Sequence, residues 1–581
     1  SQVRDHGCLF ITLNLQRNNF GYIEMKAGCQ GCMSLPTCLF AINVKCEIMK
    51  KQILFVFFLS LTLVTSAKQR TEQELQNAAR QFLLGKDAHR MEAMNRSSIK
   101  AIIKDSQLTI FDGSNGKCVI VANDDIFKPI LGYTDSPFSQ TDMAPAFKWW
   151  METINRSMEQ MLTQGEMPKK TTRNEKYRKA VAQLLTTTWS QESPYSDLCP
   201  TYTQNAKTYH YVTGCVATAM AQIMYYYKYP EKGKGYNRWT YYPNDDKIGT
   251  TIRVNFTNTY DWNNMLPTYK KGNYNAAQAN AIATLMKDCG GAVSMQYSTS
   301  GSGAYASDAC IALRKNFKYH DGLKLYTRSF YTLDEWMDLI YRELNDECPI
   351  LYGGVTKSGA GHEFVFDGYD KDGLVHVNWG WNGTNNGYFD VTLLNSAQGT
   401  FSEGQNMVVV RLPNDERYTQ TRSSLWGIEG LELTLTNNVL KAKQLTAYNI
   451  DADNFTGEVQ LVAEDVHTHS VTILTQNTTF ESIKNGTGYN MNLSANVSKL
   501  PNGEYLIYLA SKSTLTGKEE FEWQRARCVE GTTNYYTLTI RDGNYTINKG
   551  KGNLTTALDS PTLVSQDTAS APYTYIYNMQ G

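Results

Sequence analysis

The spacing of apolar residues along the chain predicts helices first and strands later. Helical periodicity marks residues 71–84, 147–162, 216–227, 275–293 and 334–344. Short apolar runs bounded by Gly, Asn or Asp predict strands at residues 349–355, 363–370, 374–381 and 387–394. Because helices precede an antiparallel sheet, we expect an α+β fold for residues 179–412.

The segment before this region combines helices with a hairpin. Residues 68–178 contain a helix, a hairpin at 106–124, a turn-rich stretch at 128–135 and a second helix, which together indicate a small α+β unit. The unit ends in KKTTRNEKYRKA, a basic stretch without apolar periodicity that we expect to be an exposed linker open to proteolysis. A small domain followed by a cleavable linker is typical of a propeptide.

Beyond Asn414 the helical patterns give way to alternating apolar and polar residues. These short strands are separated by turns and predict a β-sandwich, of the Ig-like kind, at residues 413–548. Residues 549–581 then form a polar linker and a short tail that ends in YTYIYNMQG.

The first 67 residues carry a targeting signal rather than a folded domain. Residues 49–67 contain two lysines, an apolar run and a small-residue cleavage site, which is the pattern of a signal peptide. We interpret residues 1–48 as a leader translated from a mis-called start codon. The apolar run is too short to span a bilayer comfortably, so we expect secretion or surface display in a bacterium, with no membrane span after signal removal.

Charge and cysteine content narrow the possible functions. The chain has 56 Lys and Arg against 56 Asp and Glu, so no net field attracts nucleic acid. The CQGC pair in the leader lacks a second CxxC or HxxxH partner, and we expect neither a metal nor another cofactor. Seven cysteines follow the signal peptide; this odd number leaves at least one free thiol if the others pair.

One of these cysteines begins an unusually apolar helix in TGCVATAMAQIMYYYKYP. Cys215 there is a buried filler, half of a disulfide, a metal ligand or a nucleophile. The preceding Gly214 permits a close approach, and the positive end of a helix favours the thiolate and lowers its pKa. These features favour Cys215 as a nucleophile.

A nucleophilic thiol needs a base, and histidine is the usual one. His362 lies between glycines and a strand in SGAGHEFVFDGYD, which would hold its imidazole rigidly. His376, on the following strand, is equally well explained as a buried histidine bonded to the backbone. His210 and His320 lie in polar tracts typical of surface residues. The hypothesis is therefore that His362 is the base.

Further residues are placed to assist this pair. Asn378 follows His362 across one strand turn and is expected to orient its imidazole, with Trp379 and Trp381 shielding that bond from water. Gln191 precedes the cysteine in WSQESPY and is suited to donate to an oxyanion, together with the backbone N–H of the nucleophile.

The motifs TGCVATAMAQIMYYYKYP, GHEFVFDGYD and HVNWGWNGTNNGYF occur in that order and closely resemble the streptopain family of bacterial cysteine peptidases, a distant branch of the papain-like fold. The resemblance covers about residues 68–412. It implies that Cys215 is the nucleophile, His362 the base and Gln191 the oxyanion glutamine. Asn378 and Trp379 hold the position of the element that orients the histidine, and either one can be the more important.

The resemblance also implies a substrate groove and an inhibitor. Ser302 in SGSGA and Gly361 before the histidine match groove residues, and Trp381 is expected to contribute to the groove. Glu363 departs from the small residue expected after the histidine and would alter pH dependence or preference if its carboxylate faced the groove. The partners implied are protein or peptide substrates and the chain's own propeptide, VIVANDDIFKPILGYT being its signature.

Three functions follow from these residues. The first is a secreted cysteine endopeptidase made as an inactive zymogen, cut near Lys176 to Lys179. The second is a non-catalytic surface binding module on a peptidase scaffold, although Cys215, His362 and Gln191 are all present. The third is a transglutaminase-like or amidase acyltransferase, in which an amine rather than water reaches the acyl-enzyme.

Overall fold

The chain forms two compact units, residues 1–67 and 68–581, in a computed structural model. The structure describes residues 14–17, 23–26, 68–84, 99–112, 117–134, 138, 141–243, 247–355, 361–395, 404–417, 426–475, 479–513 and 523–554. In the first unit these residues form one hairpin of β1 (Asn14–Arg17) and β2 (Ile23–Lys26). The predicted signal peptide and the tail from residue 555 onward lie outside the described residues.

The second unit contains the predicted helices and one helix that the pattern missed. They are α2 (Glu72–Leu84), α4 (Pro145–Gln164), α5 (Cys215–Tyr227), α6 (Ala276–Ala292), α7 (Ala306–Lys315) and α8 (Leu333–Asn345). Helices α6 and α8 begin with capping boxes, in which Asn275 pairs with Gln278 and Thr332 with Glu335. Among the described residues no helix combines the length and apolar character needed to cross a bilayer.

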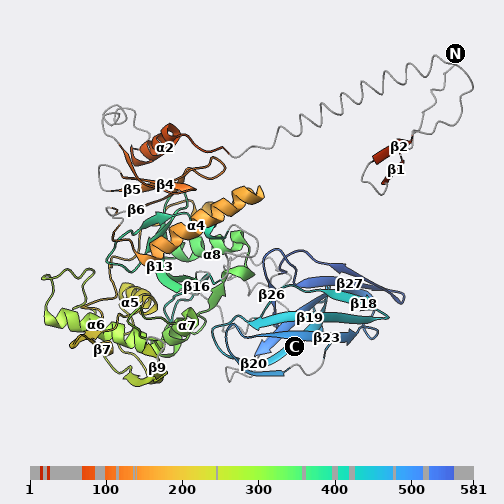
Figure 1. Cartoon of the computed structure of the whole chain (residues 1–581). Coiled ribbons are helices and arrows are strands. Elements are labelled where there is room, and N and C mark those ends of the chain that lie inside the picture. The colour runs from red at the N-terminus through yellow and green to blue at the C-terminus, as the bar shows by residue number, and fades with distance from the viewer. Residues whose placement is uncertain are drawn as a thin grey trace, which may run out of the picture. The chain divides into compact units, whose positions relative to one another are not determined.

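A ten-stranded sheet joins the segment around α2 and α4 to the segment around α5 to α8 (Figure 1). Its spatial order is β11-β16-β12-β13-β14-β15-β6-β5-β4-β3, with antiparallel neighbours. The strands are β3 (Lys100–Lys104), β4 (Leu108–Asp112), β5 (Cys118–Ala122), β6 (Ile130–Thr134), β11 (Leu325–Thr327), β12 (Ile350–Val355), β13 (Gly361–Tyr369), β14 (Val375–Asn378), β15 (Gly387–Phe389) and β16 (Asn406–Val409). We name residues 68–164 the N-terminal region and residues 181–417 the central region.

Strand β6 makes this connection, and it was predicted to be a turn. Residues 128–135 contain Pro129 and Gly132, which favour turns in an isolated segment. In the fold, β6 pairs with β5 on one side and with β15 of the central region on the other. A Cβ on Gly132 would lie 2.6 Å from the Phe389 ring, so the glycine permits the close pairing of the two regions.

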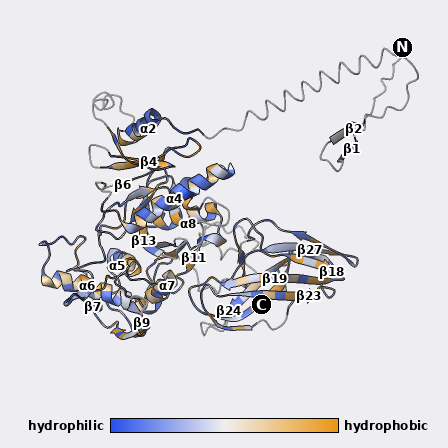
Figure 2. Ribbon diagram, in the orientation of Figure 1, coloured by the Kyte–Doolittle hydropathy of each residue, from blue (hydrophilic) through white to orange (hydrophobic). Residues whose placement is uncertain are grey.

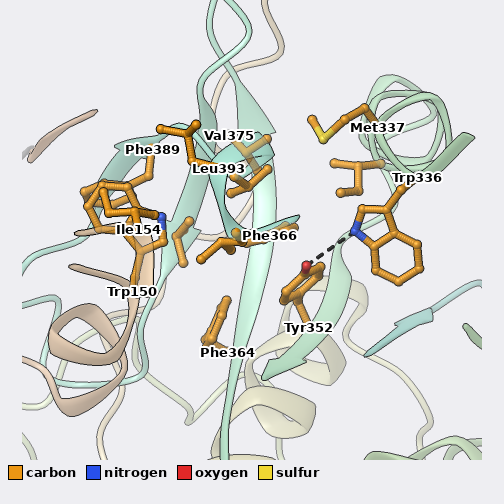
Figure 3. Close-up of a cluster of buried hydrophobic side chains, with 14 of the residues drawn as sticks. Trp150, Ile154, Trp336, Met337, Tyr352, Phe364, Phe366, Val375, Phe389 and Leu393 are labelled. Carbon is orange, nitrogen blue, oxygen red and sulfur yellow. Dashed lines mark hydrogen bonds between the residues drawn. The ribbon is translucent and has the colours of Figure 1, made fainter. Parts of the chain in front are cut away.

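The two faces of the sheet in the central region bury different cores. Along β13, Phe364 and Phe366 face a core shared with α4 and α8, as Figure 3 shows around Trp336 and Tyr352. Val365 faces the opposite core, which contains the apolar residues of α5, α6 and α7. Because side chains alternate along a strand, each residue of β13 belongs to one of these faces.

Helix α4, which covers the sheet, has one buried and one exposed face. Helix α4 alternates hydrophobic and hydrophilic colours in Figure 2, as expected for a helix with one buried face. Two short hairpins, β7 (Thr201–Gln204) with β8 (Lys207–His210) and β9 (Tyr236–Tyr241) with β10 (Thr250–Asn255), lie outside the main sheet. Among the described 3₁₀ turns, η1 (Glu175–Tyr177) lies between the two named regions, and η3 (Arg328–Phe330) and η4 (Thr392–Asn395) lie in the central region.

Residues 426–554 form two sheets around one apolar core, and we name them the C-terminal β region. The first sheet contains β17 (Trp426–Ile428), β18 (Leu433–Thr436), β19 (Val439–Asn449), β23 (Gly488–Asn496) and β26 (Arg527–Cys528). The second contains β20 (Phe455–Asp465), β21 (Val471–Ile473), β22 (Thr479–Ile483), β24 (Gly503–Ser513), β25 (Gln524–Arg525), β27 (Tyr535–Arg541) and β28 (Asn544–Lys549). The strand-rich character predicted from alternation is thus confirmed.

Candidate active site

Cys215 is the first residue of α5, as the sequence predicted. Gly214 before it has φ +86°, and a Cβ there would lie 2.7 Å from the Met295 sulfur and 2.9 Å from the Ser302 carbonyl oxygen. The glycine is therefore required both by the backbone conformation and by the lack of space. It lets the loop that carries Ser302 pack against the start of the helix.

The cysteines of the described regions are all free thiols. Six of the seven are buried, and Cys215 is the one that is partly exposed. The buried ones are Cys118, Cys199, Cys289, Cys310, Cys348 and Cys528. Cys215 is thus distinguished from the others by access as well as by its place on a helix.

The predicted lowering of the thiol pKa is wrong for this structure. Burial raises the pKa of the Cys215 thiol to about 11, and the charge of Glu363 adds to the rise. Hydrogen bonds from the backbone N–H groups of Glu363 and Val216 favour the thiolate but do not offset the loss of water. The thiol at the helix start is therefore held in its protonated form.

His362 stands on β13, opposite Gly354 of β12. Alternation places it with Phe364, on the face of the sheet away from α5, and Trp149 of the N-terminal region lies over Gly354. Burial lowers the pKa of His362, which favours the neutral imidazole. Among the described contacts no hydrogen bond joins the imidazole to the Cys215 thiol.

Asn378 does not hold His362 in this structure, although we expected it to do so. Its Nδ2 donates to the Thr187 carbonyl at 2.7 Å, and its Oδ1 accepts from the Gly380 N–H at 3.1 Å. In the ladder it lies opposite Val365, three positions beyond the histidine. Asn378 therefore ties β14 to the segment that precedes Gln191.

Trp379 lies next to the histidine face of β13. Its ring is 4.9 Å from Phe364 and 5.4 Å from Phe389, centroid to centroid, and its Nε1 donates to the Asn385 carbonyl at 2.8 Å. Trp381 is half-buried and packs against the same core. Both tryptophans thus border the core that covers the His362 side of the sheet.

Gln191 is brought close to the nucleophile by the backbone. The Thr213 N–H donates to the Gln191 carbonyl at 3.1 Å, two residues before Cys215. Ser302 is buried beside Gly214, and its Oγ has no hydrogen-bond partner among the described residues. Gly361 is exposed at the start of β13. The segments of Gln191 and Ser302 therefore meet at the start of α5.

The sequence analysis missed Gln222. Its side chain is fully buried on α5, and its Oε1 accepts from the Thr187 hydroxyl at 2.8 Å and from the Trp189 N–H at 3.4 Å. It thus fastens the nucleophile helix to the segment leading to Gln191. The sequence feature that could have identified it is the isolated amide side chain of Gln222 in an otherwise apolar helix, seven residues after Cys215 and so on the same side of the helix.

Asp367 was missed as well. Its carboxylate contacts the His376 Nδ1 at 2.5 Å and accepts from the Leu185 N–H at 2.9 Å. His376 is buried as considered, but it is bonded to a carboxylate rather than to the backbone. The pair joins β13 and β14 to the residues that lead towards Gln191.

Glu363 does not face an open groove. It is 6% exposed and lies on the α5 side of β13. No cluster of His, Cys, Asp and Glu with the arrangement of a metal site occurs in the described part of the chain. The described residues therefore provide a thiol at a helix start and a histidine on the far face of the neighbouring strand, with the segment of Gln191 close to the helix start.

The residues around this site match known proteins. The sequence pattern of the Peptidase C10 family matches residues 189–389. The chain is 34% identical over 319 residues to the thiol protease/hemagglutinin PrtT of Porphyromonas gingivalis, covering 51% of this chain and 36% of that protein. It is 32% identical over 352 residues to streptopain of Streptococcus pyogenes, covering 57% of this chain and 87% of that protein.

Solved structures of related enzymes also match. A prointerpain A fragment from Prevotella intermedia is 40% identical, with a TM-score of 0.49, and the match covers 54% of this chain and 97% of that one. Active interpain A from the same organism is 44% identical, with a TM-score of 0.37 and coverage of 41% and 98%. The sequence matches to streptopain and to the Peptidase C10 family confirm the predicted resemblance, and the chain belongs to the Peptidase C10 family of cysteine-type peptidases.

Proposed function

We propose that the protein is a secreted cysteine endopeptidase that is made as a zymogen. In this proposal residues 1–48 are a leader, 49–67 a signal peptide, 68–178 an inhibitory propeptide and 179–412 the papain-like catalytic domain. Residues 413–548 form an Ig-like β-sandwich and 549–581 a linker and tail. The observation that carries the proposal is the partly exposed thiol of Cys215 at the start of α5.

The catalytic step follows from the residue types. The Cys215 thiolate attacks a peptide carbonyl, His362 transfers the proton to the leaving amine, and water then hydrolyses the acyl-enzyme. The Gln191 amide and the backbone N–H of Cys215 donate to the oxyanion. Trp379, which borders the core on the His362 side of β13, orients the histidine, whereas Asn378, bonded to the Thr187 carbonyl and the Gly380 N–H, holds the segment before Gln191 in place.

The groove and the partners complete this proposal. Ser302, Gly361 and Trp381 line the groove for a protein or peptide substrate. Neither a cofactor nor nucleic acid takes part.

Latency is supported by the position of the N-terminal region. Trp149 of α4 packs 6.0 Å from Phe364, centroid to centroid, and lies over Gly354, the cross-strand neighbour of His362. We infer that these contacts keep the imidazole on the face away from Cys215. Removal of the N-terminal region would free the start of β13 to change its backbone conformation, which would turn the imidazole towards the thiol so that the two can form their ion pair.

The linker proposed for cleavage is anchored at two points. Arg173 donates to the carbonyls of Asp370 and Lys371, and Tyr177 is 2% exposed, so the linker is less free than its polar sequence suggested. The residues on both sides of Tyr177 are exposed. Cleavage near Lys176 to Lys179 therefore remains the proposed step.

An experiment on residues 68–581 tests the proposal. The wild type and Cys215→Ala are incubated with a thiol, and chain mass and casein cleavage are followed over time, with the buried-site variant Cys528→Ala as the control. We expect the wild type and the control to trim near Lys176 and digest casein while Cys215→Ala stays whole.

Two other outcomes would change the assignment. If removal of the first 110 or so residues by an added protease gives no activity, the chain is a non-catalytic binding module. If peptides become joined to amines rather than hydrolysed, it is an acyltransferase.

A further inference from the structure

Three residues on neighbouring strands lie side by side beneath the start of α5. Gly353 of β12 pairs with Glu363 of β13 on one side and with Asn406 of β16 on the other. Their strand neighbours Val365 and Val408 belong to the core of α5. Alternation therefore directs Glu363 and Asn406 towards the nucleophile helix.

The glycine between them is covered by both side chains. A Cβ on Gly353 would lie 2.2 Å from the Glu363 Oε2 and 3.2 Å from the Asn406 Oδ1. The two polar side chains thus lean over the same backbone position from opposite strands. Only glycine leaves them the room to do so.

Each of the two side chains carries a buried oxygen that lacks a partner in the described part of the chain. The Glu363 Oε1 and the Asn406 Oδ1 are both buried without a hydrogen-bond partner among the described residues. The Asn406 Nδ2 donates to the Gly404 carbonyl at 3.2 Å, which fixes the amide orientation, since a flipped amide would set oxygen against oxygen. Two acceptors satisfy one another only if one carries a proton, and the carboxyl is the group that can.

The surroundings favour that proton. Burial raises the pKa of Glu363 to about 8. The titratable groups around it are Cys215 on α5, Tyr352 on β12 and His362 on β13 itself, and none of these is a permanent cation. A carboxyl without a cationic partner in such a place is more stable in its neutral form.

Glu363 is coupled to the nucleophile in two ways. Its backbone N–H bonds to the Cys215 thiol, and its charge, when present, raises the pKa of that thiol. The backbone contact helps the thiolate and the ionised carboxylate opposes it. The protonation state of one side chain therefore decides which effect prevails.

We propose that Glu363 is a positioning residue of the nucleophile: its neutral carboxyl donates a hydrogen bond to Asn406, and its ionisation in alkaline solution opposes formation of the Cys215 thiolate. The identity of Cys215 as the nucleophile rests on the proposed function, whereas the coupling between the two groups does not. The reactivity of the thiol can therefore be measured without any peptide hydrolysis.

The test is the rate of alkylation of Cys215 by iodoacetamide as a function of pH, in residues 68–581. The wild type is compared with Glu363→Gln, which is always neutral, and with the exposed-site control Glu231→Gln. The three profiles should coincide below about pH 8, and above it Glu363→Gln should reach half-maximal rate about one pH unit lower than the others, because a neighbouring like charge is removed. Coincident profiles at every pH, or slower alkylation of Glu363→Gln, would overturn the proposal.

A measurement on the wild type covers the case in which Glu363→Gln does not fold. The infrared C=O stretch of a protonated carboxyl should be present at about pH 7 and be lost by about pH 10, whereas exposed carboxyls have ionised well below that range. Absence of the band at about pH 7 would overturn the proposal. A chain that alkylates as expected but cleaves no casein would contradict the proposed function and leave this coupling intact.

Discussion

The N-terminal region and the C-terminal β region are both attached to the central region, but by different forces. The N-terminal region continues the central sheet through β6 and β15 and buries aromatic rings. The C-terminal β region also makes apolar contacts with the central region, but it adds arginine side chains paired with carboxylates. The first attachment covers the histidine side of the site, and the second contacts α7, η3 and α8.

The apolar attachment is built around one helix. Phe147 and Trp150 of α4 lie 5.5 Å and 4.8 Å from Phe389 of β15, centroid to centroid, and the Trp150 Nε1 donates to the Asp390 carbonyl at 3.3 Å. Phe147 also lies 5.9 Å from Trp379. Such contacts depend little on salt or pH, so a change of solution alone should not detach this region.

The charged attachment is specific in geometry. Arg527 donates to Glu335 at 2.9 Å and to the Phe330 carbonyl at 2.8 Å, and the Arg314 Nη2 lies 2.6 Å from Asp453. The arginine side chains are almost fully buried while their carboxylate partners keep partial access to water. The C-terminal β region is therefore fixed by ion pairing as well as by burial, and its attachment should respond to charge.

The largest expected effect is on the apolar attachment. Replacing Trp150 by Ala in residues 68–581, with Cys215→Ala to prevent cleavage, should lower the free energy of unfolding by about 4 kcal/mol, because a fully buried ring leaves a cavity. Urea unfolding, followed by far-ultraviolet circular dichroism of the backbone, measures this loss. The exposed-site control Lys148→Ala on the same helix should change the free energy of unfolding little. An equal loss in both variants would mean that burial of the Trp150 ring is not what stabilises the attachment.

A smaller loss is expected at the charged attachment. Arg527→Ala in the same background should cost about 3 kcal/mol, since it leaves the Phe330 carbonyl and Glu335 without their cationic partner. The exposed Arg541→Ala is the matched control. A loss below about 0.5 kcal/mol, typical of surface pairs, would mean that the C-terminal β region is held by apolar contacts like the N-terminal region.

Local pattern predicted most helices and strands because each has a strong period or cap. It failed for β6, where Pro129 and Gly132 indicate a turn and only pairing with β15 stabilises a strand. It failed for α7, whose N-cap Tyr305 makes no side-chain cap bond and follows a Gly/Ser loop. Strand β6 is stabilised by pairing with β15, and α7 by burial in the core that it shares with α5 and α6; local spacing contains neither contact.

The site shows the same limit. Cys215 and His362 stand out through glycines and element starts, so their elements could be predicted. The direction of a side chain could not, because one position of register decides which face His362 or Glu363 occupies. For the same reason the bond of Asn378 to Thr187, rather than to the histidine, was not predictable.

Solution pH should change the stability of the charged attachment, because Asp451 lies near Arg314 and Asp453. Burial, with Asp453 nearby, raises the pKa of Asp451 from 3.8 to about 6, and Arg314 partly opposes the rise. Because the folded pKa is raised, the neutral carboxyl is favoured. The contribution of Asp451 to stability is therefore fully present below about pH 4 and is lost as pH rises through about 6.

Asp451→Asn should therefore leave stability unchanged at about pH 4 and raise it by on the order of 1 kcal/mol at about pH 7. Urea unfolding at the two pH values measures the difference, with the exposed Glu504→Gln as the control. A gain of equal size at both values would show that the charge of Asp451 is not responsible.

The smallest effect is expected where the two attachments meet. Lys169, in the linker after the N-terminal region, contacts Glu530 of the C-terminal β region at 2.8 Å, and the same carboxylate pairs with the buried Arg328 at 3.1 Å. The Lys169 side chain is 49% exposed, so water and salt screen its pairing, and Lys169→Ala should cost no more than about 0.5 kcal/mol. Lys170→Ala is the matched control, and urea unfolding in low and high salt is the measurement. A salt-independent loss above about 1.5 kcal/mol would show that the linker itself holds the two regions together, and the division into an apolar and a charged attachment would then fail.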